Sequence, residues 1–431
     1  MTRPSLAVLL LALAALPLSA QEAPPNAAPG AATGDLGLVV ERATGSLVLI
    51  DRSDRAALAR IEGLGDLSHA SLTYGPDERF AYVFGRDGGL TKVDLLTQSI
   101  VARTVQAGNS IGGAISDDGR LVAVSNYEPG GVKVFDAETL ALVADIPAAG
   151  KTVGLVDVPG RRFAWTVWET GEVFLGDFSG AEPVVTALGI AGKNPFDAVL
   201  TDDAHTYLVG LFGEKGVTAF DLWSEVPAPV KFLTEYGKTG EDMPVYKMPH
   251  LQSWAFAEGQ YALPAVGRHE VLWVDRDSLA QVAATPVHGQ PVFIIEQPAS
   301  PYVWVNFATP LNDTVQVIDS RSHEVVATLT PGRAILHMEF APRGAEVWMS
   351  ARDDNKVVIY DTRTREKLGE VAAEAPSGIF FTARASDGVV TPWAGWTPST
   401  CGSWTGSSAT CRWCRGPLPP WRRRWRSTRP R

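Results

Sequence analysis

Short runs of apolar and mixed residues, rich in β-branched and aromatic side chains, recur along the chain and end in an aspartate, as in residues 132–136 (VKVFD). The closing aspartates are Asp51, Asp94, Asp136, Asp177, Asp221, Asp275, Asp319 and Asp361. Successive aspartates are 43, 42, 41, 44, 54, 44 and 42 residues apart. A period of about 40–45 residues built from short strands is typical of a β-propeller. The sequence therefore predicts an all-β fold, an eight-bladed β-propeller with four-stranded blades over residues 35–385.

Each repeat divides into four runs at Gly, Pro and Asp turn signals. In the second repeat the runs are residues 67–74, 80–84, 90–94 and 100–105, which we expect to be the inner, second, third and outer strands of a blade. The first repeat lacks an inner run, whereas residues 377–384 resemble an inner strand with no further strands after it. We therefore expect the N- and C-terminal strands to share one blade and close the ring, which removes exposed sheet edges.

The first 20 residues resemble a secretory signal peptide, with Arg3, an apolar run over residues 6–18 and small residues before Gln21. This run is too short to span a bilayer comfortably; the alternative is an ordinary hydrophobic helix. We expect cleavage after Ala20, a flexible linker over residues 21–34, and a periplasmic mature protein with no membrane span.

Residues 386–431 depart from the repeat. They hold six of the 13 Trp, all three Cys, and eight Arg against one acidic residue. The propeller itself therefore has no cysteine to form a disulfide, and Cys411 and Cys414 are followed by Arg415, not by the His of a c-type haem attachment motif. We expect this atypical Trp/Arg-rich tail to be disordered or an off-frame translation, and not a nucleic-acid or membrane patch.

Three of the seven histidines occupy similar places in their repeats. His69 precedes Asp94 by 25 residues, His250 precedes its aspartate by 25, and His337 by 24. Because an equal offset in a repeat indicates an equal height on the propeller axis, we expect the three imidazoles to share one central funnel. The alternative is that they are unrelated core or rim histidines.

Cationic and aromatic residues are expected around the same funnel. Five cations follow predicted second strands: Arg42, Arg86, Lys215, Arg268 and Arg352. Five aromatic residues lie on predicted inner strands: Phe196, Trp254, Phe293, Phe340 and Phe380. On a chain of net charge −10, such cations would favour a flat apolar ligand edged with carboxylates. Asp157, also on an inner strand, is a candidate proton donor or acceptor among these groups, although it could equally close a turn.

The motifs carry a family resemblance. Residues 69–87, in which His69 precedes a Gly-Arg-Asp turn, resemble the haem-binding propeller of cytochrome cd nitrite reductase, where the matching His is the proximal haem d1 ligand. Residues 248–250 (Met-Pro-His) look like its Thr-Pro-His segment at a distal histidine, and residues 344–348 (GAEVW) are similar to its Gly-Asp-Glu-Val-Trp stretch. The lack of a Cys-x-x-Cys-His motif and the run at residues 378–384 point to the NirF family of haem d1 biosynthesis proteins.

This resemblance implies a function and roles for individual residues. It implies binding of haem d1 or a late iron-tetrapyrrole precursor, and a late maturation step for nitrite reductase during denitrification. His69 would supply an imidazole to the haem iron, and His250 and His337 would face the other side of the ring or a reacting side chain. The carboxylates would be held by Arg86, Arg268 and Arg352, while Asp157 would transfer a proton or orient a histidine.

The reaction and the partners stay open at this point. One possibility is a side-chain modifying enzyme, dehydrogenase-like or decarboxylating, that works with nitrite reductase and other haem d1 maturation proteins. A second is a non-catalytic carrier that delivers haem d1 to nitrite reductase. A third is a cofactor-free propeller that binds proteins. No glycine-rich nucleotide motif precedes a helix, so soluble nicotinamide chemistry lacks its usual platform, and nothing indicates a nucleic-acid partner.

Overall fold

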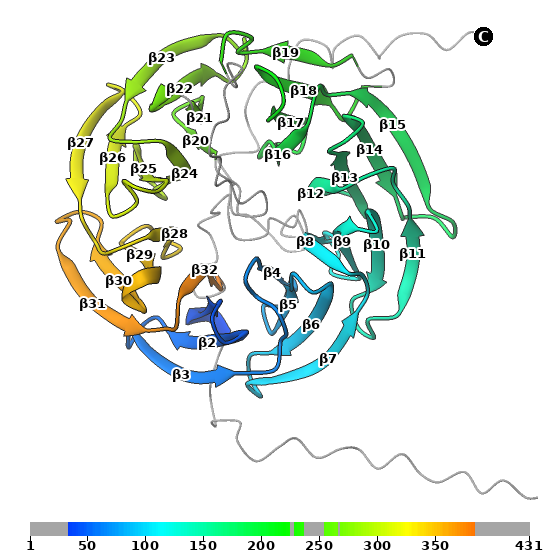
Figure 1. The fold of residues 1–431 in the computed structure, drawn as a ribbon, viewed down its shortest axis with the longest axis horizontal. Coiled ribbons are helices and arrows are strands. Elements are labelled where there is room, and N and C mark those ends of the chain that lie inside the picture. Colours follow the sequence, from blue (N-terminus) through cyan, green and yellow to red (C-terminus); the bar gives the residue numbers. More distant parts are fainter. Residues whose placement is uncertain (1–32, 225–227, 237–253, 266–267, 384–431) are drawn as a thin grey trace, which may run out of the picture. The chain divides into compact units, whose positions relative to one another are not determined.

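The computed structural model describes residues 33–224, 228–236, 254–265 and 268–383, all within one unit, Met1–Thr397. The predicted signal peptide, nearly all of the predicted linker, the tail and His250 lie outside the described residues. The described residues form eight four-stranded antiparallel sheets, which Figure 1 shows arranged as blades around an axis. The predicted all-β, eight-bladed propeller is confirmed.

Blade 1 combines β1 to β3 with β32, and blades 2 to 8 follow in chain order, four strands each. The inner strands, in blade order, are β32 (Pro376–Phe381), β4 (Ser71–Tyr74), β8 (Asn109–Ile115), β12 (Thr152–Val158), β16 (Pro195–Leu200), β20 (Ala255–Ala257), β24 (Pro291–Glu296) and β28 (Ile335–Phe340). The second strands are β1 (Leu36–Glu41), β5 (Phe80–Phe84), β9 (Leu121–Glu128), β13 (Arg162–Val167), β17 (Thr206–Leu211), β21 (Gln260–Ala265), β25 (Tyr302–Phe307) and β29 (Glu346–Ala351).

The outer half of each blade is equally regular. The third strands are β2 (Ser46–Asp51), β6 (Gly89–Asp94), β10 (Gly131–Asp136), β14 (Glu172–Asp177), β18 (Val217–Asp221), β22 (Glu270–Asp275), β26 (Val315–Asp319) and β30 (Lys356–Asp361). The outer strands are β3 (Ala56–Ile61), β7 (Ser99–Val105), β11 (Leu142–Ile146), β15 (Val184–Ile190), β19 (Val230–Phe232), β23 (Gln281–Pro286), β27 (Glu324–Leu329) and β31 (Lys367–Ala372). Two short 3-10 helices, η1 (Thr33–Asp35) and η4 (Arg352–Asp354), complete the described elements that concern the site.

Blade 1 joins the two ends of the propeller chain. Strand β32 pairs antiparallel with β1, and Thr382 continues the contact beyond the strand. Its backbone N–H donates to the Leu36 carbonyl at 3.0 Å, while the Leu36 N–H donates to the Thr382 hydroxyl at 3.0 Å. The predicted closure by N- and C-terminal strands is confirmed, and it pairs a sheet edge that would otherwise be exposed.

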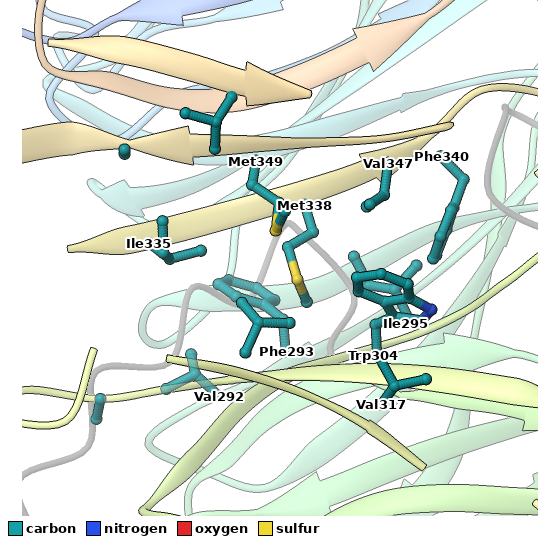
Figure 2. Close-up of a cluster of buried hydrophobic side chains, with 14 residues drawn as sticks. Val292, Phe293, Ile295, Trp304, Val317, Ile335, Met338, Phe340, Val347 and Met349 are labelled. Atoms are coloured by element: carbon teal, nitrogen blue, oxygen red, sulfur yellow. The ribbon is translucent and has the colours of Figure 1, made fainter. Parts of the chain in front are cut away.

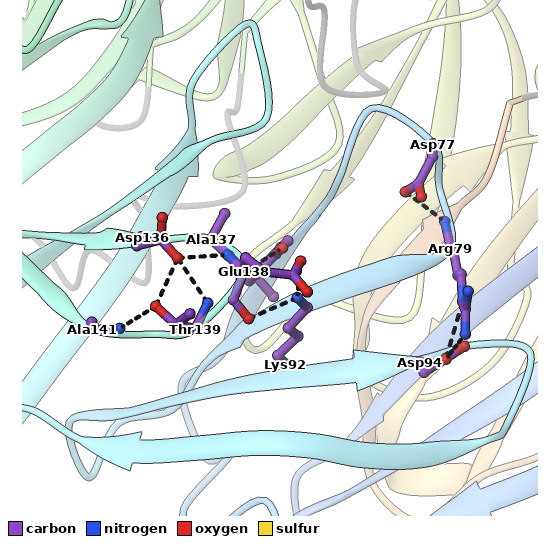
Figure 3. A network of polar contacts seen from close by, with 10 residues as sticks. Asp77, Arg79, Lys92, Asp94, Asp136, Ala137, Glu138, Thr139 and Ala141 are labelled. Atoms are coloured by element: carbon purple, nitrogen blue, oxygen red, sulfur yellow. Dashed lines mark hydrogen bonds and ion pairs between the residues drawn. The ribbon is translucent and has the colours of Figure 1, made fainter. Parts of the chain in front are cut away.

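The aspartate that defines the repeat has a local structural task. Each one ends a third strand and accepts a backbone N–H from the turn that follows, as Asp136 does from Glu138 at 3.1 Å and from Thr139 at 2.8 Å (Figure 3). These side chain to backbone bonds fix the turn into the outer strand. The repeat in the sequence is therefore a repeat of one turn.

The core lies between neighbouring blades. Figure 2 shows the cluster between blades 7 and 8, where Phe293, Trp304, Met338 and Phe340 pack together. The Trp304 and Phe340 rings meet edge to face, with centroids 5.9 Å apart. Each blade buries its faces against its neighbours, so its stability depends on the blades beside it.

Antiparallel pairing gives the propeller two distinct faces. Every inner strand begins at the face that also carries the loops between second and third strands, which we call the start face. Every inner strand ends at the opposite face, which we call the end face. This face carries the turns between inner and second strands and those between third and outer strands. A residue's place along its inner strand therefore decides which face it serves.

Candidate functional site

His69 lies on the start face of blade 2, in a turn that precedes β4 by two residues. This turn forms because the Asp66 carboxylate accepts the Ser68 N–H at 2.8 Å. The Asp66 carbonyl accepts the Arg86 N–H at 2.8 Å, which ties the turn to the loop between β5 and β6. The residues that lead into the inner strand thus bring His69 and Arg86 together.

Arg42 and Arg86 act on His69, and Arg352 acts in turn on Arg42. Arg42 of blade 1, Arg86 of blade 2 and Arg352 of blade 8 each follow a second strand. Burial, followed by the positive charges of Arg352 and Arg86, lowers the pKa of Arg42, and only Asp66 opposes this. Arg352 donates from Nε to Asp353 at 2.8 Å. Within the described part of the chain neither Arg42 nor Arg86 forms an ion pair, so the group retains positive charge for an anion.

The surroundings keep the His69 imidazole neutral. Burial, then the charges of Arg42 and Arg86, lowers its pKa to about 4, with Asp66 acting in the opposite direction. Metal ligation by histidine uses the neutral imidazole. Burial first, and the charges of Arg42 and Arg86 second, favour this neutral form of His69.

His337 lies on a different level from His69. It sits inside β28, between Ile335, which pairs with Ala351, and Met338, which pairs with Met349. Its Nδ1 accepts the Ile379 N–H at 3.1 Å, so the ring proton is on Nε2. The sequence offsets predicted that His69 and His337 lie at one height along the axis. They do not, because His69 lies in the turn before β4 whereas His337 lies inside β28, where the register shifts.

Aromatic rings from the adjacent inner strands enclose His337. Its ring lies 5.9 Å from Phe293 of β24, edge to face, and stacks on Phe380 of β32 at 6.0 Å. Burial lowers the pKa of His337 to about 3, so it too is neutral at pH 7.

Two of the five cations expected around the axis have partners elsewhere. Arg268, between β21 and β22, lies over the Tyr236 ring at 4.6 Å from its centroid. Lys215, between β17 and β18, pairs with Glu235 at 3.9 Å. Both are on the start face, in blades 5 and 6, and neither contributes to the charges that act on His69.

Asp157 is the second-last residue of β12 and therefore lies toward the end face, away from the arginines. It pairs with Phe163 across the blade, and the charge that acts on it is Asp117, in the turn between β8 and β9. Burial raises the pKa of Asp157 to about 7. Its side chain keeps slight solvent access although protein surrounds it. The signal in the sequence was its offset, since Asp157 lies 20 residues before the aspartate of its repeat whereas His69 lies 25 before.

A second buried carboxyl, which the sequence did not single out, occupies the same level in blade 8. Glu339 is the second-last residue of β28, and burial raises its pKa to about 8 against the opposing charge of Arg52. Its charge also acts on Tyr74 at the end of β4, whose hydroxyl donates to the Phe380 carbonyl at 2.8 Å. The available signal was an acidic residue in an inner-strand run, two positions after His337.

Two further properties bear on what the site could hold. Among the described residues, no group of three or more His, Cys, Asp or Glu side chains could bind a metal ion by itself. None of the helices in the described ranges is long and apolar enough to cross a membrane.

The chain is similar to known proteins over the length of the propeller. The model of the cytochrome D1 heme domain matches residues 31–385, which is the whole propeller. The chain belongs to the cytochrome D1 heme domain family. It is similar to Protein NirF of Stutzerimonas stutzeri, at 52% identity over 90% of this chain and 99% of that protein. It is equally similar, at 52%, to Protein NirF of Pseudomonas aeruginosa, over 82% of this chain and 92% of that protein.

Other similar proteins are less close in sequence. The dihydro-heme d1 dehydrogenase of Pseudomonas aeruginosa is 27% identical over 80% of this chain and 71% of its own length. The solved structure of dihydro-heme d1 dehydrogenase NirN in complex with DHE has a TM-score of 0.71 at 26% identity, covering 82% of this chain and 76% of that one. Apo AztD from Citrobacter koseri, with a TM-score of 0.60 at 11% identity, covers 80% and 96% and shares the fold alone.

Proposed function

We propose that this protein binds haem d1 or a late iron-tetrapyrrole precursor on its start face and acts in haem d1 biosynthesis, at a late maturation step for nitrite reductase. The observation that carries the proposal is a neutral imidazole, His69, on which the charges of Arg42 and Arg86 act, with Arg352 acting on Arg42. Membership of the cytochrome D1 heme domain family supports it. So does the likeness to NirN, which was solved in complex with DHE.

The start face fits the chemistry of such a ligand. A tetrapyrrole with carboxylate side chains needs charge-assisted donors at its edge and one neutral nitrogen ligand near its iron. His69 supplies the nitrogen, and Arg42, Arg86 and Arg352 supply the donors. When bound, the iron contributes a Lewis-acidic and redox-active centre.

The other candidates take supporting positions in this proposal. His337 is neutral and lies deeper along the axis, where it would face the ring side opposite His69 or a reacting substituent. His250 has the same proposed role, and Arg268 would bind a carboxylate on the blade 6 side. These assignments rest on position in the repeat and on the family motifs.

Asp157 and Glu339 are proposed as proton-holding groups at the far end of the axis. Both have a pKa raised by burial to near neutrality, about 7 and about 8, which suits exchange of protons at the working pH. Their place on the end face means that contact with a ligand on the start face would be through intervening groups.

One observation favours a second candidate function, a carrier that holds haem d1 and passes it to nitrite reductase in the periplasm. With its pKa near 4, His69 stays unprotonated at pH 7 and cannot donate a proton there. A site whose nearest charged groups are permanently cationic arginines binds well and has few means of acid–base catalysis. Turnover of a late precursor in a defined mixture separates enzyme from carrier.

Absorption spectroscopy tests the binding proposal directly. Titrating the purified propeller with haem d1 should shift the absorption spectrum of the ligand, and His69→Ala should change the shifted spectrum. The matched control is His205→Ala, because His205 is an exposed histidine of the end face, paired with Asp221. An unchanged spectrum on mixing, or identical spectra for wild type and His69→Ala, would remove the assignment of His69.

A further inference from the structure

His69 lies in a connector and not in a strand. The ladder that β4 forms with β5 begins at Ser71, so the place of the His69 backbone depends on residues 62–70, which join β3 to β4. We call these residues the His69 connector. Two of its leucines, Leu64 and Leu67, are each 1% exposed and pack in the core between blades 1 and 2. Contacts to the connector therefore help to fix the position of the imidazole.

An ion pair of blade 2 lies against the His69 connector. Arg103, on the outer strand β7, donates from Nη2 to Oδ2 of Asp87 at 2.6 Å and from Nε to the Leu64 carbonyl at 3.3 Å. The other carboxylate oxygen of Asp87, Oδ1, accepts the Gly89 N–H at 3.0 Å. The side chains of Arg103 and Asp87 are half-buried, at 24% and 31% exposed. One guanidinium thus joins the connector to the loop between β5 and β6.

The connector is also packed tightly against its neighbours. The ion pair leaves no room for a Cβ on Gly65, whose φ of +86° is itself a conformation that favours glycine. The Leu64 N–H donates to the Gly45 carbonyl of blade 1 at 3.3 Å, and the Asp66 carbonyl accepts the Arg86 N–H at 2.8 Å. The backbone just before His69 is therefore held by blade 1, by the outer strand of blade 2 and by the loop that carries Arg86.

The ion pair acts on both segments that meet beside His69. Asp87 directly follows Arg86 in the loop, and Leu64 precedes Asp66 by two residues in the connector. Without the Arg103 guanidinium, the Leu64 carbonyl and the Asp87 carboxylate would each lose a donor in a half-buried place, which is unfavourable. The connector would then be free to move away from the loop.

We propose that Arg103 and Asp87 are positioning residues for the tetrapyrrole site: their ion pair holds the His69 connector against the loop at residues 85–88, so that the imidazole is presented beside Arg86. This inference rests on the proposed function and adds to it two residues that set the geometry of the imidazole. Arg103 belongs to the outermost strand of its blade, and its role does not require contact with the ligand. It acts through His69.

Arg103→Gln tests the proposal, with haem d1 as the probe. In the protein without ligand, hydrogen exchange of residues 62–70 should become about ten-fold faster, because the connector opens more often. In an absorption titration, haem d1 should bind about ten-fold more weakly, which is typical for loss of a group that orients a metal ligand. The His69-dependent part of the spectrum should fall as well.

A double-variant cycle shows whether the ion pair acts through His69. When His69 is already alanine, adding Arg103→Gln should change the affinity for haem d1 by less than about two-fold, because the effects of coupled residues do not add. Asp87→Asn should reproduce the results of Arg103→Gln, since asparagine keeps an acceptor for the Gly89 N–H but loses the ion pair. This second variant keeps the test open if Arg103→Gln does not fold.

Lys231→Gln is the matched control. In blade 5, Lys231 of the outer strand β19 pairs at 3.1 Å with Glu214, in the loop between β17 and β18. Glu214 also accepts the Lys193 N–H, from the connector of that blade, at 2.8 Å. The construction is similar to that in blade 2, but this connector carries no histidine. Lys231→Gln should leave the exchange of residues 62–70 unchanged and the affinity within about two-fold of wild type.

The outcomes separate this inference from the proposed function. If wild type shows a His69-dependent spectrum but Arg103→Gln weakens binding equally with and without His69, the inference alone is overturned, because the ion pair then acts on some other part of the protein. Unchanged exchange of residues 62–70 in Arg103→Gln and in Asp87→Asn has the same consequence. No His69-dependent spectrum with haem d1 in wild type overturns the proposed function and this inference with it.

Discussion

The two faces of the propeller treat charge in opposite ways. On the start face, burial and the charges of Arg42 and Arg86 lower the pKa of His69 to about 4. On the end face, burial raises the pKa of Asp157 to about 7 and that of Glu339 to about 8. Burial therefore favours the neutral form of each group: His69 and Glu339 are mostly neutral at pH 7, and Asp157 is about half ionised. The faces differ in the kind of group that is buried, an imidazole in a start-face turn and two carboxyls inside the inner strands β12 and β28 toward the end face.

Removing the arginines should have the largest effect. We expect the triple variant Arg42→Gln, Arg86→Gln, Arg352→Gln to bind haem d1 about 100-fold more weakly than wild type, because each guanidinium contributes a charge-assisted hydrogen bond. The affinity that remains should depend less on salt. Isothermal titration at two salt concentrations measures both changes.

The matched control removes three exposed arginines from the end face: Arg120, Arg321 and Arg363. It changes the net charge by the same amount and should leave the affinity within about two-fold. Equal losses in the two triple variants would mean that overall charge, and not the start face, attracts the ligand.

Glu339 should make stability depend on pH. Its folded pKa of about 8 lies above the unfolded value of 4.5, so the folded state binds the extra proton and stability is lost as the pH rises from 4.5 to 8. At pH 8 we expect Glu339→Gln to be more stable than wild type by about 2 kcal/mol, after allowing for partial solvent access. At pH 4 the two should unfold alike, as measured by urea denaturation across this range; a constant difference at all pH values would contradict the raised pKa.

His69 should act in the opposite direction and more weakly. Its folded pKa of about 4 is below the unfolded value of 6.5, so its contribution is complete above pH 6.5 and is lost as the pH falls toward 4. His69→Gln should therefore lose about 1 kcal/mol less stability than wild type between pH 7 and pH 5. If wild type and His69→Gln lost the same stability between pH 7 and pH 5, the pKa of His69 would not be lowered in the folded protein.

The smallest effect should come from an aspartate of the repeat. Asp136→Ala removes side chain to backbone bonds in an exposed turn (Figure 3), and we expect a loss of about 0.5 kcal/mol. Binding of haem d1 should not change. Calorimetric melting measures the loss of stability, and an absorption titration of the same sample measures the affinity for haem d1. A change in affinity would show that this end-face turn affects binding on the start face.

The fold followed from the sequence because one turn repeats. The aspartate spacing predicted eight blades, and the unmatched run at residues 377–384 predicted the closure that β32 makes with β1. The predicted start of the inner strand β4, at residue 67, was wrong. The Asp66 turn keeps His69 out of the strand, so the strand begins at Ser71 and not near residue 67.

The site was partly predictable. The position of Arg42 and Arg86 after second strands predicted that they lie near His69. The separation of Asp157 could also have been predicted, because Asp157 lies 20 residues before Asp177 whereas His69 lies 25 before Asp94. The partner of Arg268, Tyr236, lies in another strand connection, and a repeat offset holds no information about such a contact.

The axial ligand is the most direct test of the account. Low-temperature electron paramagnetic resonance of the ferric haem d1 complex should show a nitrogen axial ligand in wild type and in His205→Ala. The signal should be lost in His69→Ala and return when free imidazole is added. A nitrogen ligand that persists in His69→Ala without imidazole would contradict the assignment of His69 and, with it, the claim that the start face of blades 8, 1 and 2 forms the tetrapyrrole site.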